Sequence, residues 1–493
     1  MLKTSEGYEY TPSTGLRQGL PTAAVVSPPQ LRVSTAQTYD VIVIGAGFAG
    51  IISARDLLAK GYKVLLIEAR DRIGGRTWTT QTENGDYLDI GGTYIHWAQP
   101  HFWVELVRYG LKNEVKNCRE YFQGSALPVT FLNGEKKTWE PHELHNLLEK
   151  CLQLYYNPDG ERASDVVPLP HSPLSNIARA VHFDKMSAAD RFSQLKGELN
   201  EVEIAMIEAF TMAMCGPPLE EASYFDLLQR WVLGGGTSED YNARMVGYKL
   251  KRGQTSLLRA IFDEISSNPN LSWTFSTPVQ SIDTSGLKVA SVVAANGNVF
   301  HARKVICTIP LMVLRTIKFV PELPIPKAEA IASSRSNLTQ KVHAVVDGKE
   351  WRSWTGVKFV NNGVTMMSGD PYSNSTTTTN LVVFTAGDGR VPRENPQEQL
   401  EVFQSMDPSL NVSRLVFGDF NNDPYARGSW CLFQPKYMTR YLSLLQCGVG
   451  NLKFASGDIS DGWRGFIDGA IESATLVAKE VDGELKHERT GKL

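Results

Sequence analysis

Three glycines at a fixed spacing, Gly45, Gly47 and Gly50, have the clearest chemical meaning in this sequence. They follow "YDVIVI" (39–44), an apolar run typical of a buried parallel strand. In this spacing the first glycine permits a tight turn, the second lets the backbone approach a pyrophosphate, and the third lets helix and strand pack closely. The pattern predicts a phosphate cradle at a helix amino end, where free N–H groups favour negative charge.

The elements around these glycines complete a nucleotide-binding unit. Apolar spacing predicts a helix over about 49–60, which Gly61 ends as a C′ glycine. A second strand, "KVLLIEA" (63–69), follows at once and closes on Glu68. An acidic residue at that point binds the ribose hydroxyls of adenosine. The sequence therefore predicts a dinucleotide site.

A second glycine pair follows the acidic residue in "EARDRIGGRTWT" (68–79). Gly74 and Gly75 are flanked by Arg72 and Arg76. An enzyme that binds a nicotinamide cofactor does not need a second basic, glycine-rich turn here. An enzyme that permanently holds a larger cofactor does need one. We interpret Arg76 as a pyrophosphate contact, with a surface loop rich in Arg and Gly as the alternative.

Further segments occur in an order that resembles the flavin-containing amine oxidase family. They are "DIGGTYIHW" (89–97), "TPVQSI" (277–282), "KVICTIPLMVL" (304–314) and "FASGDISDGWRGFIDGAIESA" (454–474). The resemblance covers roughly residues 39 to 480. "GYEYTPSTGLRQGLP" (7–21) resembles the amino-terminal arm of the fungal monoamine oxidases, which bind FAD non-covalently and are the expected nearest relatives.

The resemblance implies an α/β protein, α+β overall, in which a Rossmann-type FAD-binding domain is assembled from separated segments. A helix-rich substrate domain with a mixed sheet is inserted between them. The expected division is 1–38 for an amino-terminal arm, 39–125, 246–335 and 415–480 for the FAD-binding domain, 126–245 and 336–414 for the substrate-binding domain, and 481–493 for a tail. For residues 1–38, an arm along the surface and plain disorder both stay open.

The resemblance also implies the residues that bind FAD. They are Gly45, Ala46, Gly47, Gly50, Glu68, Ala69, Arg70, Gly75, Arg76, Gly92, Thr93, Val279, Asp458, Gly465 and Ile467. Among them, the Val279 backbone meets adenine and Asp458 bonds the ribityl chain. Mammalian-type enzymes bond their flavin covalently through a cysteine just before an aromatic residue, and Ser429 stands at that position here. Cys431 comes one residue after that aromatic residue and, in an extended chain, lies on the opposite side from it, so we expect FAD to be held non-covalently.

Three residues are the expected catalytic set. Trp430 and Phe466 resemble the two aromatic walls of the family, between which the amine reaches the flavin. Apolar walls favour an uncharged amine, because desolvation lowers an amine's pKa. Lys341, in "QKVHAVVDG", faces the same side as His343. The family has a lysine on this strand that holds a water near flavin N5 and helps the reduced flavin react with oxygen.

The inserted region indicates helices. "SAAD" (187–190) has the pattern of a capping box. Ile204, Ile207 and Met214 recur at near-helical spacing. Phe210 and Met214 are candidates for lining a substrate channel, with ordinary core packing as the alternative.

The expected reaction is oxidation of a small amine, a primary monoamine, by O2 to an imine and hydrogen peroxide. Alternatives within the fold are a polyamine oxidase, an L-amino-acid oxidase using Arg352 against a carboxylate, and a flavin desaturase. An NAD-linked dehydrogenase and a non-catalytic flavoprotein scaffold are alternatives from other classes. A panel of amines with peroxide detection separates them.

Composition limits the partners of the chain. Its 493 residues predict two domains, and a formal net charge of −3 with no dense basic run argues against nucleic acid. No apolar run reaches the roughly 18 residues of a membrane helix. The six cysteines show no metal-ligand spacing, so no metal is expected. We expect the thiols to be reduced, as in an intracellular protein. The ending "GKL" partly resembles a peroxisomal signal, and a homodimer stays open.

Overall fold

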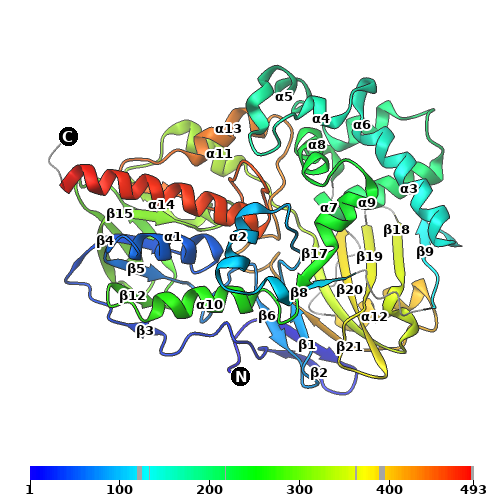
Figure 1. Ribbon diagram of the computed structural model, residues 1–493, viewed down its shortest axis with the longest axis horizontal. Coiled ribbons are helices and arrows are strands. Elements are labelled where there is room, and N and C mark those ends of the chain that lie inside the picture. The colour runs from blue at the N-terminus through cyan, green and yellow to red at the C-terminus, as the bar shows by residue number, and fades with distance from the viewer. Residues whose placement is uncertain (119–124, 133, 217, 361–362, 388–394, 490–493) are drawn as a thin grey trace.

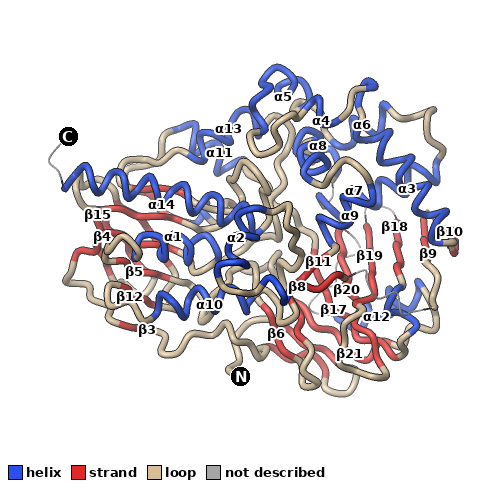
Figure 2. The backbone as a smooth tube through the Cα atoms, in the orientation of Figure 1, coloured by secondary structure: helices blue, strands red, loops and turns tan. Residues whose placement is uncertain are grey.

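The chain folds into two neighbouring halves, each built on a large sheet (Figure 1). This computed structural model describes residues 1–489 apart from 119–124, 133, 217, 361–362 and 388–394. Helices and strands occur in both halves, which confirms the α/β class with α+β character overall (Figure 2). The ending "GKL" (491–493) lies outside the described residues.

The first sheet, named here the nucleotide sheet, has the glycine-bearing strand near its centre. β4 (Thr38–Ile44) runs parallel to β5 (Val64–Ile67) on one side and to β15 (Val299–Cys307) on the other. Residues 41–44 of β4 are at most 3% exposed, as expected for a strand covered on both faces. The other strands are β3 (Gln30–Leu31), β12 (Leu271–Thr274), β13 (Val279–Asp283), β14 (Ala290–Ala294), β16 (Lys318–Val320) and β22 (Leu452–Phe454).

Helices from both ends of the chain cover the nucleotide sheet. α1 (Phe48–Leu58) packs against α14 (Ile467–Arg489) and α10 (Thr255–Ser266), and α14 also contacts α2 (Pro100–Arg108). α1 ends two residues earlier than expected, because the N–H groups of Lys60 and Gly61 already turn back to the last carbonyls of the helix. Gly61, with φ +82°, is the predicted C′ glycine, since its N–H donates to the Leu58 carbonyl over 2.9 Å and the Tyr62 N–H donates to the Leu57 carbonyl over 3.3 Å. α11 (Ile325–Ser333) and α13 (Tyr437–Gln446) pack together nearby.

The second sheet is mainly antiparallel. Its order is β10 (Glu135–Thr138), β9 (Val129–Leu132), β18 (Thr355–Val360), β19 (Gly363–Asp370), β20 (Thr378–Gly387), β17 (Gln340–Asp347), β21 (Val412–Phe417), β1 (Tyr8–Thr11) and β2 (Gly15–Gln18). Val342, Ala344 and Val346 of β17 share a core with α12 (Pro396–Met406). Because side chains alternate along a strand, Lys341 and His343 face the other way, as predicted.

The helices above the second sheet are α3 (Pro141–Tyr156), α4 (Ala163–Val166), α5 (Ile177–Phe183), α6 (Ala188–Gln194), α7 (Glu201–Cys215), α8 (Tyr224–Leu233) and α9 (Ser238–Val246). The predicted capping box is confirmed, since Ser187 accepts from the Asp190 N–H and the Asp190 side chain accepts from the Ser187 N–H. The predicted helical stripe lies on α7, which contacts β18, β19 and β20.

Residues 1–38 form an arm that touches both halves. β1 pairs with β21 of the second sheet, and β3 pairs with β12 of the nucleotide sheet. The expected domain boundary at residue 415 falls inside β21, whose partners β17 and β1 belong to the second sheet. The expected tail from 481 is helical as far as Arg489, because α14 continues through it.

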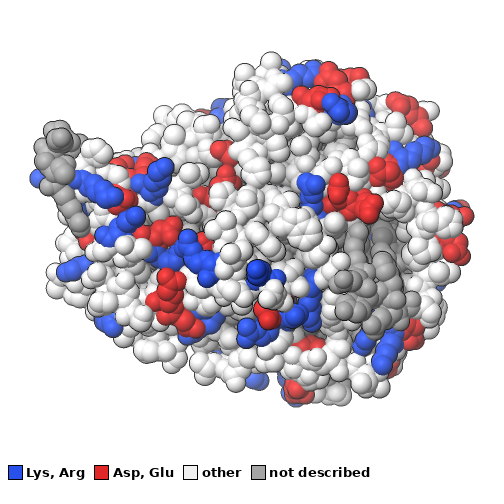
Figure 3. All heavy atoms as spheres, in the orientation of Figure 1, with Lys and Arg blue, Asp and Glu red and all other residues white. Residues whose placement is uncertain are grey.

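The visible face of the molecule carries both basic and acidic side chains, without one sign covering it (Figure 3). Within the described part of the chain, no helix has the length and apolar character required to cross a bilayer.

Candidate active site

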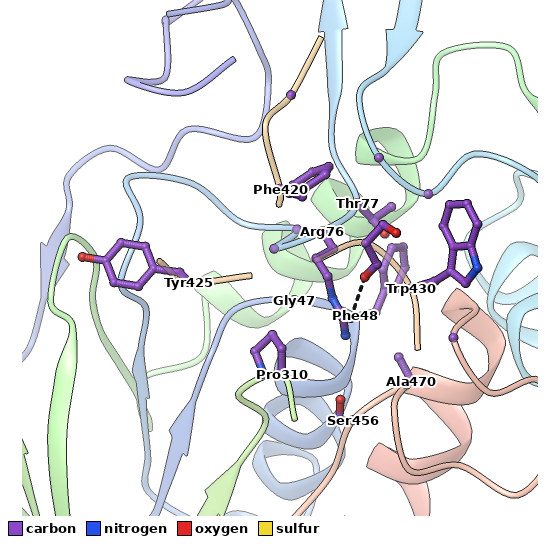
Figure 4. A pocket seen from close by; sticks show the side chains of 18 of the residues that line it. Gly47, Phe48, Arg76, Thr77, Pro310, Phe420, Tyr425, Trp430, Ser456 and Ala470 are labelled. Carbon is purple, nitrogen blue, oxygen red and sulfur yellow. Dashed lines mark hydrogen bonds between the residues drawn. The ribbon is translucent and has the colours of Figure 1, made fainter. Parts of the chain in front are cut away.

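A cavity of about 490 Å³ lies between the two halves and has a size typical of small-molecule sites (Figure 4). The glycine turn and β5 line one end, and residues of β17, β19 and β20 line the other. Of the expected site residues, those that line it are Gly45, Gly47, Glu68, Ala69, Arg70, Gly75, Arg76, Gly92, Thr93, Met214, Val279, Lys341, Trp430, Gly465, Phe466 and Ile467.

The glycine turn has the geometry that its sequence predicts. Gly45 has φ +106°, in the region that favours glycine, and a Cβ added at Gly50 would overlap the Gly45 carbonyl oxygen. Gly47 is the N-cap of α1 and offers no side-chain cap, so the first N–H groups of the helix stay free. Gly50 does not line the cavity, and its role is the close packing of helix on strand.

The second glycine turn forms the opposite side of the cradle. The Gly74 N–H donates to the Ala46 carbonyl over 2.8 Å, and a Cβ added at Gly75 would come within 3.8 Å of the Gly47 Cα. A Cβ at Gly47 would meet only the Gly74 backbone, at 3.8 Å, so both glycines leave the cradle open for a ligand. Ala46 supports this contact and does not itself line the cavity.

Glu68 lies at the end of β5 with its carboxylate held by the backbone. Its Oε2 accepts from the Ala46 N–H over 2.6 Å and its Oε1 from the Arg70 N–H over 2.9 Å. Burial raises the pKa of Glu68, and these contacts together with the charge of Arg70 oppose the shift. The carboxylate therefore sits at a fixed position beside the glycine turn, where a ribose acceptor is required.

Arg76 reaches across the cavity to the carboxy-terminal segments (Figure 4). Its guanidinium donates to the Ser429 carbonyl over 2.8 Å and pairs with the Asp458 carboxylate over 2.8 Å. The second Asp458 oxygen accepts from the Leu311 N–H over 3.0 Å. Asp458 thus lies behind the cavity wall, next to Arg76, and is not among the lining residues.

Lys341 projects from β17 onto the segment that follows β7 (Tyr87–Asp89). Its ammonium donates to the carbonyls of Asp89, over 2.6 Å, and of Gly91, over 3.2 Å, and to the Thr93 hydroxyl. Lys341 is 8% exposed. Burial lowers the pKa of Lys341 to about 8, although the charge of Asp89 opposes the shift. The protonated form therefore still predominates at pH 7, and the amine loses its proton as pH rises through about 8.

Two aromatic residues line the same cavity from different segments. The Trp430 indole N–H donates to the Met214 carbonyl over 2.9 Å, and the Phe384 ring meets Trp430 edge-on at 6.1 Å between centroids. Phe466 packs edge-on against Trp463 at 5.2 Å. These contacts fix the orientation of both rings.

The two residues expected to line a substrate channel lie differently with respect to the cavity. Met214 lines the cavity at the carboxy-terminal end of α7. Phe210, one turn earlier, does not line it, and its ring packs instead against Tyr241 of α9 at 5.7 Å. Although Phe210 and Met214 lie on the same face of α7, only the residue nearer the end of the helix reaches the cavity.

Several residues that line the cavity were not predicted from the sequence. They include Phe48, Thr77, Arg230, Pro310, Met366, Phe384, Phe420 and Tyr425. Phe420 and Tyr425 belong to the segment after β21, which has no periodic pattern. Only the proximity of this segment to Trp430 could have suggested it.

Comparison with known proteins gives the class. A family model described as flavin-containing amine oxidoreductase matches residues 48–482. The chain therefore belongs to the flavin-containing amine oxidoreductase family, which confirms the expected resemblance.

Individual relatives span nearly the whole chain. Pseudooxynicotine dehydrogenase of Pseudomonas sp. is 29% identical over 462 residues, 91% of this chain and 87% of that protein. The flavin-containing amine oxidase A of Sus scrofa is 24% identical over 469 residues, which cover 90% of this chain and 84% of that protein. Among solved structures, cyclohexylamine oxidase from Brevibacterium oxydans has a TM-score of 0.70 at 18% identity, covering 91% of this chain and 100% of that one. This likeness is one of fold.

The family implies FAD, and the residues present fit it. Two glycine turns leave an open cradle in front of a helix amino end, and Glu68 stands beside it. The far end of the cavity is aromatic and apolar, as a flavin ring and a small amine require. The family also uses a small-molecule amine and O2.

Proposed function

We propose that this protein oxidises small primary monoamines at a non-covalently held FAD, passing the electrons to O2 and releasing an imine and hydrogen peroxide. The observation that supports it most is that one cavity is lined by the glycine cradle, by Lys341 and by both Trp430 and Phe466. We propose as well that the chain divides into an FAD-binding and a substrate-binding domain.

When bound, FAD supplies the acceptor for the hydride equivalent that leaves the carbon next to the amine nitrogen. Trp430 and Phe466 bind the amine between them and exclude water, which favours the uncharged amine that reacts. Lys341, which donates to Asp89, Gly91 and Thr93, exchanges one of these contacts for a water molecule and, in its protonated form, stabilises the negative charge that develops as oxygen is reduced. Arg76 and the free N–H groups after Gly47 hold the pyrophosphate.

The acidic residues of the lining favour a monoamine over a polyamine. Within the described lining, Glu68 is the one carboxylate, and it lies at the nucleotide end. A second ammonium group at the aromatic end would therefore find no counter-charge there, and burying it would be costly. Arg352, the candidate for a substrate carboxylate, is bonded to the carbonyls of Ser375 and Thr378 and does not line the cavity.

The non-covalent attachment is supported by two side chains. Ser429 lines the cavity and its hydroxyl donates to the Asn337 carbonyl over 2.8 Å. Cys431 is 4% exposed and lies off the cavity, and burial keeps its pKa well above the ordinary value, so no thiolate nucleophile forms. Acid precipitation should release all of the yellow colour, and colour in the pellet would contradict the proposal.

A panel of amines tests the function. Peroxide release and oxygen uptake are measured with primary monoamines, putrescine, L-amino acids and tertiary amines. Turnover of monoamines with one peroxide per amine supports the proposal. Because two relatives are named pseudooxynicotine and nicotine dehydrogenase, an artificial electron acceptor is included without oxygen. Turnover only with that acceptor would contradict the proposal that O2 is the oxidant. Activity confined to putrescine or to amino acids would contradict the proposed monoamine substrate.

A further inference from the structure

Three neighbouring polar side chains of α8, Asp226, Gln229 and Arg230, are almost completely buried between α8 and the cavity wall. Their exposed fractions are 1%, 1% and 4%. Burying a charged or amide group costs free energy unless the group is hydrogen-bonded or paired. The hydrogen-bond partners of these three side chains therefore indicate the role of this face of α8.

Arg230 bonds to the two separate segments that carry the aromatic walls. Its Nη2 donates to the Cys431 carbonyl, directly after Trp430, and over 3.2 Å to the Arg464 carbonyl, two residues before Phe466. Its guanidinium also lies over the Phe466 ring, 5.8 Å from the centroid. One planar group thus contacts both segments at once.

Asp226, one turn earlier, repeats this bridge. One carboxylate oxygen accepts from the Phe433 N–H over 2.8 Å, and the other accepts from the Arg464 guanidinium over 2.8 Å. Although burial alone would raise the pKa of Asp226, the charges of Arg464 and Arg230 outweigh it and lower the pKa. The carboxylate therefore stays ionised and keeps both bonds.

Gln229 adds the third connection. Its Oε1 accepts from the Arg464 guanidinium over 2.7 Å, and its Nε2 donates to the Asp461 carbonyl over 2.6 Å. The segments 431–433 and 461–464 are therefore both bonded to one helix that belongs to the other half of the molecule.

We propose that Arg230 is the positioning residue that sets the spacing of Trp430 and Phe466, with Asp226 and Gln229 supporting it. This inference rests on the proposed function of the two aromatic residues. An amine held between the rings must present its reacting carbon within a narrow range of positions, and a displacement of about 1 Å can reduce a rate about 100-fold. Arg230 itself carries out no step of the reaction.

The chain offers a matched control, Arg191 of α6. It is also a buried arginine, 7% exposed, whose guanidinium donates to two backbone carbonyls, those of Tyr155 over 3.0 Å and Leu154 over 2.6 Å. Arg191 does not line the cavity. R230M and R191M therefore both lose a buried guanidinium that donates to two backbone carbonyls, and only R230M loses it at the aromatic walls.

The experiment compares the purified, flavin-loaded variants. Single-turnover flavin reduction is measured with a narrow and a bulky primary amine, and binding is measured calorimetrically with 2-phenyl-2-propylamine, which has no hydrogen on the carbon next to nitrogen and cannot react. We expect R230M to reduce its flavin 10- to 100-fold more slowly with the narrow amine, to lose at least fivefold in binding the inert amine, and to discriminate less by amine width. R191M should stay within threefold of wild type in all three. R230K, which can still donate but without the planar fork, should fall between wild type and R230M.

Each outcome bears on the inference. Equal behaviour of R230M and R191M, with wild-type protein active on amines, overturns the positioning role and leaves the proposed function intact. A wild-type protein inactive on every amine overturns the proposed function, and this inference falls with it. If R230M does not retain FAD, the R230K and R191K pair decides the question by the same measurements.

Discussion

The nucleotide end of the cavity is built mainly from one continuous stretch, Gly45 to Arg76, and from backbone groups. The aromatic end brings together Met214, Lys341, Phe384, Trp430 and Phe466, which are far apart in the chain and lie in both halves. At the first end, function depends on the absence of side chains at particular glycines. At the second, it depends on side chains that other residues hold in place. A mutation should therefore act differently at each end.

The largest effect is expected at Gly50. A Cβ at Gly50 would overlap the Gly45 carbonyl oxygen, and backbone cannot move aside cheaply. G50A should therefore yield protein without bound FAD, measured as loss of absorbance near 450 nm in the purified protein. The control is G483A, in α14, where an added Cβ meets no atom within 4 Å. That variant should keep its FAD and gain roughly 0.5–1 kcal/mol in stability. A yellow G50A protein would show that the turn tolerates a side chain.

Lys341 is expected to give the next largest effect, confined to one half of the cycle. K341M should slow the reaction of the reduced enzyme with O2 about 100-fold, since a charged group that stabilises developing negative charge is lost. Flavin reduction by the amine should change less than fivefold. Stopped-flow measurement of the two half-reactions checks this, and an equal loss in both would contradict the assignment.

The pKa of Lys341 gives this prediction a pH signature. Because the pKa is lowered to about 8, the rate with O2 should fall as pH rises through 8. His343 shares this face, and burial lowers its pKa to about 3, so H343Q should keep the step near pH 8. Between about 8 and 10.5 the folded protein has released this proton while the unfolded chain still binds it. The free energy of unfolding should therefore rise with pH in that window, and K341M should lack this contribution.

Met214 and Phe210 test the boundary of the aromatic end on a single helix. M214A removes a lining side chain and its contacts, and should raise the KM for an aromatic amine roughly tenfold. F210A removes a ring that packs on Tyr241. It should leave KM within twofold and lower the free energy of unfolding by about 2 kcal/mol. Kinetics and urea unfolding of both variants separate the two roles. A KM effect of F210A larger than that of M214A would restore the original prediction for Phe210.

The contrast between the two ends also explains what the sequence could predict. The glycine turn, Glu68 and the capping box at Ser187 depend on residues near each other in the chain, so their patterns are informative. The side of β17 that bears Lys341 follows from simple alternation. The pairing of Arg76 with Asp458, the entry of Phe420 into the cavity and the contacts of Arg230 depend on segments brought together only by folding. No local pattern encodes such contacts.

The smallest effect on turnover is expected from the arm that supports the nucleotide end. Glu6 pairs with Arg70 over 3.3 Å and with the buried Arg72, whose Nε lies 2.8 Å from the carboxylate. E6Q leaves Arg72 without this counter-charge, so the free energy of unfolding should fall by about 2 kcal/mol, while kcat stays within twofold because neither group reaches the aromatic end. Glu9, paired with Arg414 over 3.3 Å at the surface, is the control, and E9Q should cost less than about 1 kcal/mol. Urea unfolding and the rate of FAD release measure both. Equal stabilities of E6Q and E9Q would mean that the arm covers the nucleotide end without holding its arginines in place.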